Sequence, residues 1–188
     1  EAELAREALH ASEERLRLAL EAGDMGIFDW NVETGAITWS PEHARLFGLR
    51  LDEFDGTYAG FARCVHPEDR SGIEQAVEQA RRERTPYQHK YRVMWPDGSV
   101  HWIHGKGRFT YDDKGRAERM TGVVMDITEA MHNLLALQEK QVRLSAIFND
   151  SPQCIKLLDR HGIVREMNPA GLALLGVHDP ESVIGHPV

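Results

Sequence analysis

The sequence has few cysteines, no long apolar run and no excess of basic residues. Its two cysteines, Cys64 and Cys154, do not make a disulfide framework, so we expect a protein of the reducing cytoplasm. No apolar stretch approaches the roughly 18 residues that cross a bilayer. The opening residues EAELAREALH do not resemble a signal peptide either. We therefore expect no membrane contact within this segment.

Nucleic-acid binding and catalysis have little support in the sequence. The net charge of −8 argues against a nucleic-acid surface, because phosphate contacts need clustered Lys and Arg. The chain has no legible Ser-His-Asp set and no glycine-rich phosphate loop. His101 and His104 fall on opposite faces of a predicted strand, so they cannot share a metal ion. We expect no catalytic residue and no metal site here, and we expect any output enzyme to lie outside this chain.

An internal repeat divides the chain. The stretch from residue 17, RLALEAGDMGIFDWNVETGAITWSPEHARLFGL, resembles RLSAIFNDSPQCIKLLDRHGIVREMNPAGLALLGV from residue 143. The two copies share a turn glycine, a Ser or Asn before proline, and a later glycine: Gly35 with Gly162, Ser40-Pro41 with Asn168-Pro169, and Gly48 with Gly176. The second copy stops early, which predicts one complete module and the opening third of another.

The complete module has the pattern of an α+β domain. Two strands, GIFDWNV and AITWS, precede a short helix at 41–47 and a longer helix at 67–84. Three further strands follow: YQHKYRVMW, SVHWIHGKGRFTY and RMTGVVMDI. The order predicts one antiparallel sheet of five strands with helices inserted after the second. We expect four segments: a flanking helix (1–22), the domain (23–128), a linker helix (129–148) and a truncated second domain (149–188).

Several motifs in this order resemble the PAS domain with its C-terminal PAC motif. They are WSPEHARLFGL, VHPEDR, YRVMWPDGSVHWIHGKGRF and GRAERMTGVVMDITE, and the resemblance covers roughly residues 15–129. From about residue 142 the chain resembles the start of a second PAS domain. The resemblance implies a PAS fold with helices packed on one side of the sheet and signalling helices at both ends. It also implies a sensory or dimerising module of a larger signalling protein, commonly a histidine kinase or a cyclic-di-GMP enzyme.

The last strand runs into a long helix with no loop between them. Only Asp126-Ile127-Thr128 separate the two, and in PAS proteins such an Asp-x-Thr begins the helix that carries the signal outward. Asp126 and Thr128 can each cap the helix by accepting a backbone N–H. A loopless join predicts that a shift in the strand tilts or rotates the helix. The alternative is an ordinary capped helix that only links two domains.

The helix has heptad spacing. Its a-like positions are Ile127, Leu134, Gln141 and Phe148, and its d-like positions are Ala130, Leu137 and Leu144. Such a seam pairs helices in parallel, and a polar residue within it fixes the register. We expect a homodimer through this helix, although it would alternatively pack against its own domain. A weaker stripe at the N-terminus could cover the sheet or pair with a second chain: Leu9, Leu16, Leu18 and Leu20.

One face of the predicted sheet could line a small-molecule cavity, as the PAS resemblance implies. Alternation along YQHKYRVMW separates Gln88, Lys90 and Arg92 from His89, Tyr91 and Val93, and the second set suits the interior. The candidate pocket residues are His89, Tyr91, Val93, His101, Ile103, Met120, Val124, Trp30 and Trp39. Phe28 and Ile37 add apolar bulk. The alternative is a filled core with no ligand.

No particular cofactor is required by the sequence. Photoreactive flavin-binding PAS domains carry an Asn-Cys-Arg motif, which the residues around Cys64 do not match. Haem needs an axial ligand, for which His89 is better placed than His66, since His66 belongs to a turn before a helix. Haem and noncovalent flavin both stay open. Two functional classes therefore remain: a ligand- or cofactor-binding sensor, and a ligand-free module that dimerises and transmits strain.

Overall fold

The computed structural model describes residues 6, 10–11, 14–15, 18, 20, 22–177 and 179–187. It divides into two compact units, Glu1–Met131 and His132–Val188, and each is described by itself. Most of the expected flanking helix 1–22 lies outside the described residues, Leu9 and Leu16 included. No helix in the described part of the chain is long and apolar enough to span a membrane.

The first unit is built on one five-stranded antiparallel sheet. Its strands are β1 (Met25–Asn31), β2 (Ile37–Trp39), β3 (Tyr87–Met94), β4 (Val100–Tyr111) and β5 (Ala117–Asp126). They lie in the order β2-β1-β5-β4-β3, so the last strand occupies the centre of the sheet. This arrangement confirms the predicted α+β class and the predicted sheet of five antiparallel strands, and the order of the strands within the sheet comes from the structure alone.

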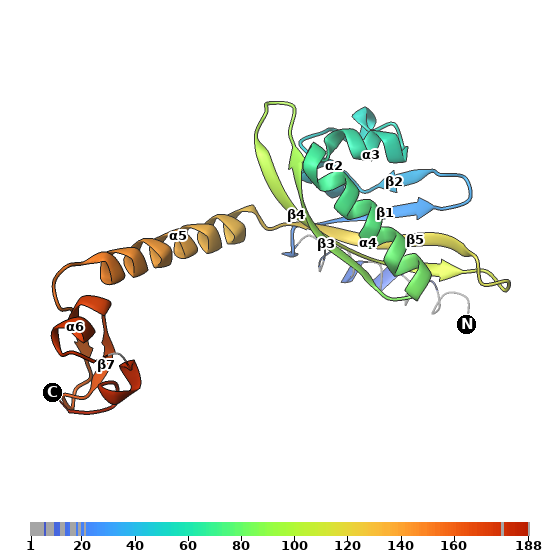
Figure 1. Cartoon of the computed structure of the whole chain (residues 1–188). Coiled ribbons are helices and arrows are strands. Elements are labelled where there is room, and N and C mark those ends of the chain that lie inside the picture. The colour runs from blue at the N-terminus through green and yellow to red at the C-terminus, as the bar shows by residue number, and fades with distance from the viewer. Residues whose placement is uncertain are drawn as a thin grey trace. The chain divides into compact units, whose positions relative to one another are not determined.

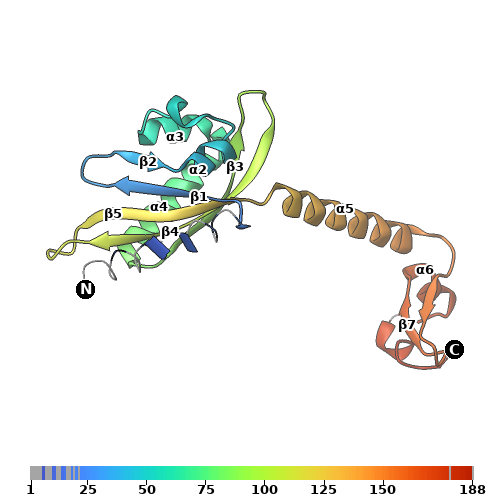
Figure 2. The same ribbon diagram turned by 180° about the vertical axis from the view of Figure 1, so that it is seen from behind.

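The helices between β2 and β3 cover one face of this sheet (Figures 1 and 2). They are α2 (Pro41–Leu46), α3 (Tyr58–Cys64) and α4 (Arg70–Glu83), with short 3-10 turns at Leu51–Glu53 and Pro67–Asp69. The prediction of one helix over 67–84 merged the second turn with α4. It also missed α3, whose seven residues are too few to establish a helical period.

The repeated sequence features have the same local geometry in both units. Ser40 caps α2 by accepting the His43 amide hydrogen, and Asn168 caps α6 (Pro169–Leu174) by accepting that of Gly171. A proline follows each cap at the first helical position, where its missing N–H costs nothing. The paired glycines have nearly equal positive φ angles: 75° and 78° at Gly35 and Gly162, and 69° and 67° at Gly48 and Gly176. The repeat is therefore structural.

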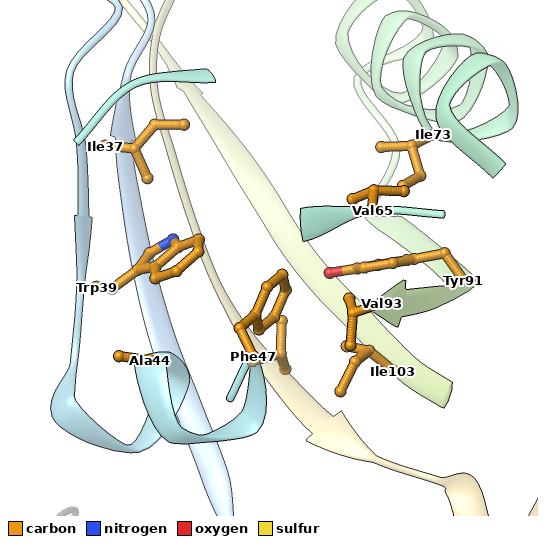
Figure 3. Packing of buried hydrophobic residues seen from close by; sticks show 10 residues of the cluster. Ile37, Trp39, Ala44, Phe47, Val65, Ile73, Tyr91, Val93 and Ile103 are labelled. Atoms are coloured by element: carbon orange, nitrogen blue, oxygen red, sulfur yellow. The ribbon is translucent and has the colours of Figure 1, made fainter. Parts of the chain in front are cut away.

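The main core lies between the inner face of the sheet and its helices. Figure 3 shows side chains from β2 and α2 facing those from β3, β4 and α4, with the Tyr91 hydroxyl directed toward the β2 side. Phe47, Val65, Val93 and Ile103 are fully buried there. The outer face of the sheet instead carries Lys90 and Lys106, which alternate with inward residues along β3 and β4.

The second unit contains most of α5 (Thr128–Asp150) and the opening elements of a second module. These elements are the strands β6 (Lys156–Leu158) and β7 (Val164–Met167), which pair in an antiparallel hairpin, then α6 and a 3-10 turn at Pro180–Ser182. Asn168 is fully buried and donates to the Phe148 and Gln153 carbonyls. One side chain therefore ties the end of α5 to the segment before β6.

Candidate functional site

A cavity of about 60 Å³ lies between the inner face of the sheet and the three helices. All five strands and α2, α3 and α4 contribute to its wall. Aromatic side chains dominate this wall, and it includes no Asp, Glu, Lys or Arg. The site is therefore suited to an uncharged occupant, because nothing in the wall offsets the desolvation of a charge.

Five of the nine candidate pocket residues line the cavity. They are Trp30 on β1, Trp39 on β2, Tyr91 on β3, and Met120 and Val124 on β5. Trp39, Tyr91, Met120 and Val124 are each at most 4% exposed. The additional candidates Phe28 and Ile37 line it as well.

The other four candidates lie elsewhere. Val93 and Ile103 face inward and are fully buried, but they belong to packed core outside the cavity. His89 lies beside the backbone of α4, where a Cβ atom on Gly72 would come within 3.2 Å of its Nε2 atom. His101 stacks on Trp95 with ring centroids 3.8 Å apart, at the end of β4 that adjoins α5.

Four aromatic residues of the cavity wall were not among the candidates. Tyr87 has the same strand parity as Tyr91, so alternation along β3 could have identified it. Tyr58 and Phe61 are on α3, the helix that the sequence did not reveal. His43 comes from α2, whose six residues give no clear inner face.

His43 is enclosed by aromatic rings. Its imidazole stacks on Trp39 with centroids 4.3 Å apart and planes 15° apart, and it meets the edge of Phe28 at 6.0 Å. Only 2% of the residue is exposed. The close approach of α2 to the sheet requires Gly26, because a Cβ atom there would lie 2.4 Å from the Cα atom of His43.

Burial keeps the His43 ring neutral. Desolvation lowers its pKa from 6.5 to about 3, while the Ile27 carbonyl has a smaller opposing effect. That carbonyl already accepts the Ser40 amide, and neither ring nitrogen has a hydrogen-bond partner among the described residues. The buried Nε1 of Trp30 also lacks a partner there. Two unpaired polar side chains therefore belong to the wall of one cavity.

The tyrosines of the cavity remain protonated. Burial raises the pKa of Tyr91 and of Tyr87, so both keep their hydroxyl hydrogens at any physiological pH. They add hydroxyl groups to the cavity without adding charge.

The dimensions of the cavity argue against a large cofactor. Sites for drug-sized ligands enclose roughly 300–1,000 Å³, several times the 60 Å³ found here. Cys64 does not line the cavity, and its thiol donates to the Gly60 carbonyl. His66 lies in the turn before α4, where its amide donates to the Arg92 carbonyl. The wall therefore does not fit haem or flavin in this conformation.

The strand-to-helix junction is anchored on β4. Ile127 donates its amide hydrogen to the Trp102 carbonyl, and the Thr128 Oγ1 atom accepts that of Trp102, both at 2.8 Å. Asp126 accepts the Thr128 amide hydrogen at 2.6 Å and so caps the start of α5. The expectation that Thr128 also caps the helix was wrong, because its hydroxyl faces the neighbouring strand.

His101 belongs to this junction and not to the cavity. Its Nδ1 atom lies 3.6 Å from the Asp126 carboxylate, and its Nε2 atom lies 3.0 Å from the Ser99 hydroxyl. The parity of His101 on β4 correctly assigned its face, but that end of the strand lies beyond the cavity.

Most heptad positions of α5 are exposed to solvent, and Phe148 is half-buried. The exposed fractions are 46% for Leu134, 64% for Leu137 and 57% for Leu144, and Gln141 is exposed as well. No residue of α5 is buried within the described chain. Within the second unit, α5 therefore presents an uncovered apolar seam.

Comparisons with known proteins agree with this architecture. Residues 36–124 match a family model described as PAS fold, and residues 142–188 match one described as PAS domain. A crystal structure of a sensory box histidine kinase/response regulator from Burkholderia thailandensis aligns with a TM-score of 0.63 and 29% identity, covering 70% of this chain and 98% of that one.

Two curated relatives are signalling proteins. The sensor protein FixL of Bradyrhizobium diazoefficiens is 25% identical over 90% of this chain and 34% of its own length. The probable diguanylate cyclase DgcE of Escherichia coli is 26% identical over 90% of this chain and 15% of its own length. The chain thus spans about a third or less of these relatives.

Proposed function

We propose that this chain, which belongs to the PAS family, is the sensory part of a larger signalling protein and passes a signal through α5 to an output domain. Relatives described as a sensor protein and a diguanylate cyclase support a histidine kinase or a cyclic-di-GMP enzyme as that output. Both matched family models describe PAS regions, so the catalytic step would belong to another part of such a protein. The two free cysteines support a cytoplasmic location.

The observation that carries the proposal is the anchoring of α5 on the strands that also form the cavity wall. Gly105 of β4 and Val124 of β5 line the cavity and are paired with each other. Closer to α5, the backbone of Trp102 on β4 forms hydrogen bonds with Ile127 and Thr128, which follow β5. A change in the cavity that shifts β4 against β5 is therefore transmitted to the first turn of α5 without an intervening loop.

The exposed seam of α5 supports a homodimer. Burial of leucine side chains at heptad spacing stabilises a pair of helices, and a second copy of the same helix has a matching seam. Gln141 lies within this seam, where a polar pair would fix the register at some cost in stability. Signal transfer would then be a change in how two helices meet.

The cavity supports binding of a small molecule as the input. A ligand-free interaction module is the second candidate, and the small volume of the cavity favours it. The coplanar stacking of Trp39 on Phe54, with centroids 3.5 Å apart, shows how fully aromatic rings already fill this region. Mass spectrometry of the denatured protein separates the two, since only the sensor releases a stoichiometric small molecule.

An insertion series in the full-length protein tests transmission through α5. Residues are added one to seven at a time after Met131, so that the Asp126 cap and the Trp102 anchor stay intact. Four residues rotate the seam by about 40° and lengthen the helix by about 6 Å, whereas seven nearly restore the heptad phase. We expect output activity to vary periodically with insertion length. A flat response would mean that the helix is only a tether.

A further inference from the structure

The polar groups that the chain leaves unpaired in its cavity indicate what the cavity takes. Buried side-chain nitrogens nearly always have a hydrogen-bond partner. Here the imidazole of His43 and the indole N–H of Trp30 have none among the described residues, although both belong to the same cavity wall. Phenylalanine at either position would fill the space without burying an unpaired nitrogen. We therefore expect these nitrogens to bind a partner from outside the chain.

The two side chains offer complementary hydrogen-bonding groups. The indole of Trp30 can only donate. The neutral imidazole of His43 carries one N–H and one acceptor nitrogen, and neither has a partner among the described residues. The second nitrogen of His43 is then free to accept. A partner that satisfies both residues has an acceptor for Trp30 and a donor for His43.

Charge and volume limit this partner further. The wall contains no Asp, Glu, Lys or Arg, so a charged ligand would lose its hydration without compensation. One water-sized group needs roughly 10–15 Å³ of such volume, so the cavity of about 60 Å³ holds about five. Flat aromatic rings make up much of the wall. A planar molecule of about five heavy atoms meets these limits.

We propose that the cavity binds a small, uncharged, planar molecule with an N–H donor and an sp² acceptor, held by the His43 imidazole and the Trp30 indole. A five-membered azole and a small primary amide share this chemistry. The inference rests on the proposed function, in which the cavity receives the input ligand. Trp30 of β1 pairs directly with Met120 of β5. A ligand bound to Trp30 would therefore act next to the strand that leads into α5.

Binding of two matched probes to the 15N-labelled chain tests the proposal. Pyrazole is a neutral five-membered ring with both groups, and furan is a ring of the same size without a donor. We expect pyrazole to shift the Trp30 indole resonance and the His43 imidazole resonances in a saturable manner. Its affinity should exceed that of furan about tenfold, as one additional net hydrogen bond gives.

Three variants locate the effect. His43→Phe should weaken pyrazole about tenfold and leave furan unchanged, because furan has no donor for the imidazole. Trp30→Phe should also weaken pyrazole about tenfold, and it should weaken furan less, because the furan oxygen is a poorer acceptor for the indole N–H. Trp102→Phe is the control, since the same change on β4 lies on the face opposite the cavity. The Trp95 indole, which donates to the Leu46 carbonyl, reports whether each variant is folded. If His43→Phe does not fold, Trp30→Phe alone tests the pair.

The outcomes separate this inference from the proposed function. Equal binding of pyrazole and furan, unaffected by either cavity variant, would overturn the polar recognition while leaving the cavity a ligand site. No saturable shift of the Trp30 resonance with either probe would overturn both. Selective binding of pyrazole that depends on His43 and Trp30, with no effect of Trp102→Phe, supports the inference.

Discussion

The buried imidazole of His43 should make the first domain sensitive to mild acid. The pKa of His43 is about 3 in the folded protein, because burial disfavours the charged ring, and 6.5 is its ordinary value. Between these values the unfolded chain binds a proton that the folded chain does not. Stability is therefore complete above pH 6.5 and falls as the pH drops from 6.5 toward 3.

The size of this loss follows from proton linkage. Each pH unit within the window costs about 1.4 kcal/mol, so the fall from pH 7 to pH 5 costs about 2 kcal/mol. This part depends on the unfolded pKa alone, since the folded ring is still neutral at pH 5. Asp69 accepts hydrogen bonds from the Arg92 side chain, which lowers its pKa below 3.8, so its contribution is lost only at lower pH.

His43→Phe removes the titration and keeps a ring against Trp39. Urea unfolding at pH 7, 6 and 5, followed by tryptophan fluorescence, reports the first unit alone because all four tryptophans lie in it. From pH 7 to pH 5 we expect the parent to lose about 2 kcal/mol more than the variant.

The matched control is His104→Gln. His104 lies on the outer face of the sheet, and its pKa is lowered by partial burial and by Lys106 and Lys90, so it acts in the same direction. Replacing His104 should therefore remove only a small part of the pH dependence of the unfolding free energy. Equal pH dependence of the parent and His43→Phe would refute the reasoning, because the ring would then be protonated or hydrogen-bonded in the folded state.

Three further predictions address the dimer seam, the cavity wall and the junction. Leu134→Asp combined with Leu137→Asp should give monomers in sedimentation experiments while the fold survives, and an unchanged dimer would point to another interface. Tyr91→Ala should cost about 3–5 kcal/mol in thermal unfolding, and His89→Ala much less, because only Tyr91 is fully enclosed; similar losses would contradict this assignment. Thr128→Val should speed hydrogen exchange of the Trp102 amide and weaken output in the full-length protein, whereas unchanged exchange would show that the Thr128 hydroxyl does not hold this strand.

Sequence reasoning succeeded where the physics is local. Ser40-Pro41 and Asn168-Pro169 fix helix starts through contacts within three residues, so the sequence shows both copies of the cap. Alternation along β3 likewise assigns Tyr91 and Val93 to the inner face, because adjacent residues of a strand point to opposite sides. Neither inference needs information from distant parts of the chain.

The cavity could not be predicted in the same way. Strand parity shows which face a residue occupies, but not whether its position lies over the cavity, over packed core or past the end of both. Tyr91, Val93 and His101 have inward parity and fall into these three cases in turn. The place of His43 depends on Gly26, seventeen residues earlier on β1, because the absence of a side chain there lets α2 lie against the sheet.

The loopless join between β5 and α5 makes physical sense once the central position of β5 is known. Because β5 lies between β1 and β4, its backbone is hydrogen-bonded on both sides and cannot move alone. A flexible loop after such a strand would absorb any displacement of the sheet before it reached a helix. Here the helix begins two residues after β5, and Thr128 returns to β4 at that point. We therefore expect a shift of β5 relative to β4 either to break the Trp102 contacts or to turn the first turn of α5, and in our proposal the second response carries the signal.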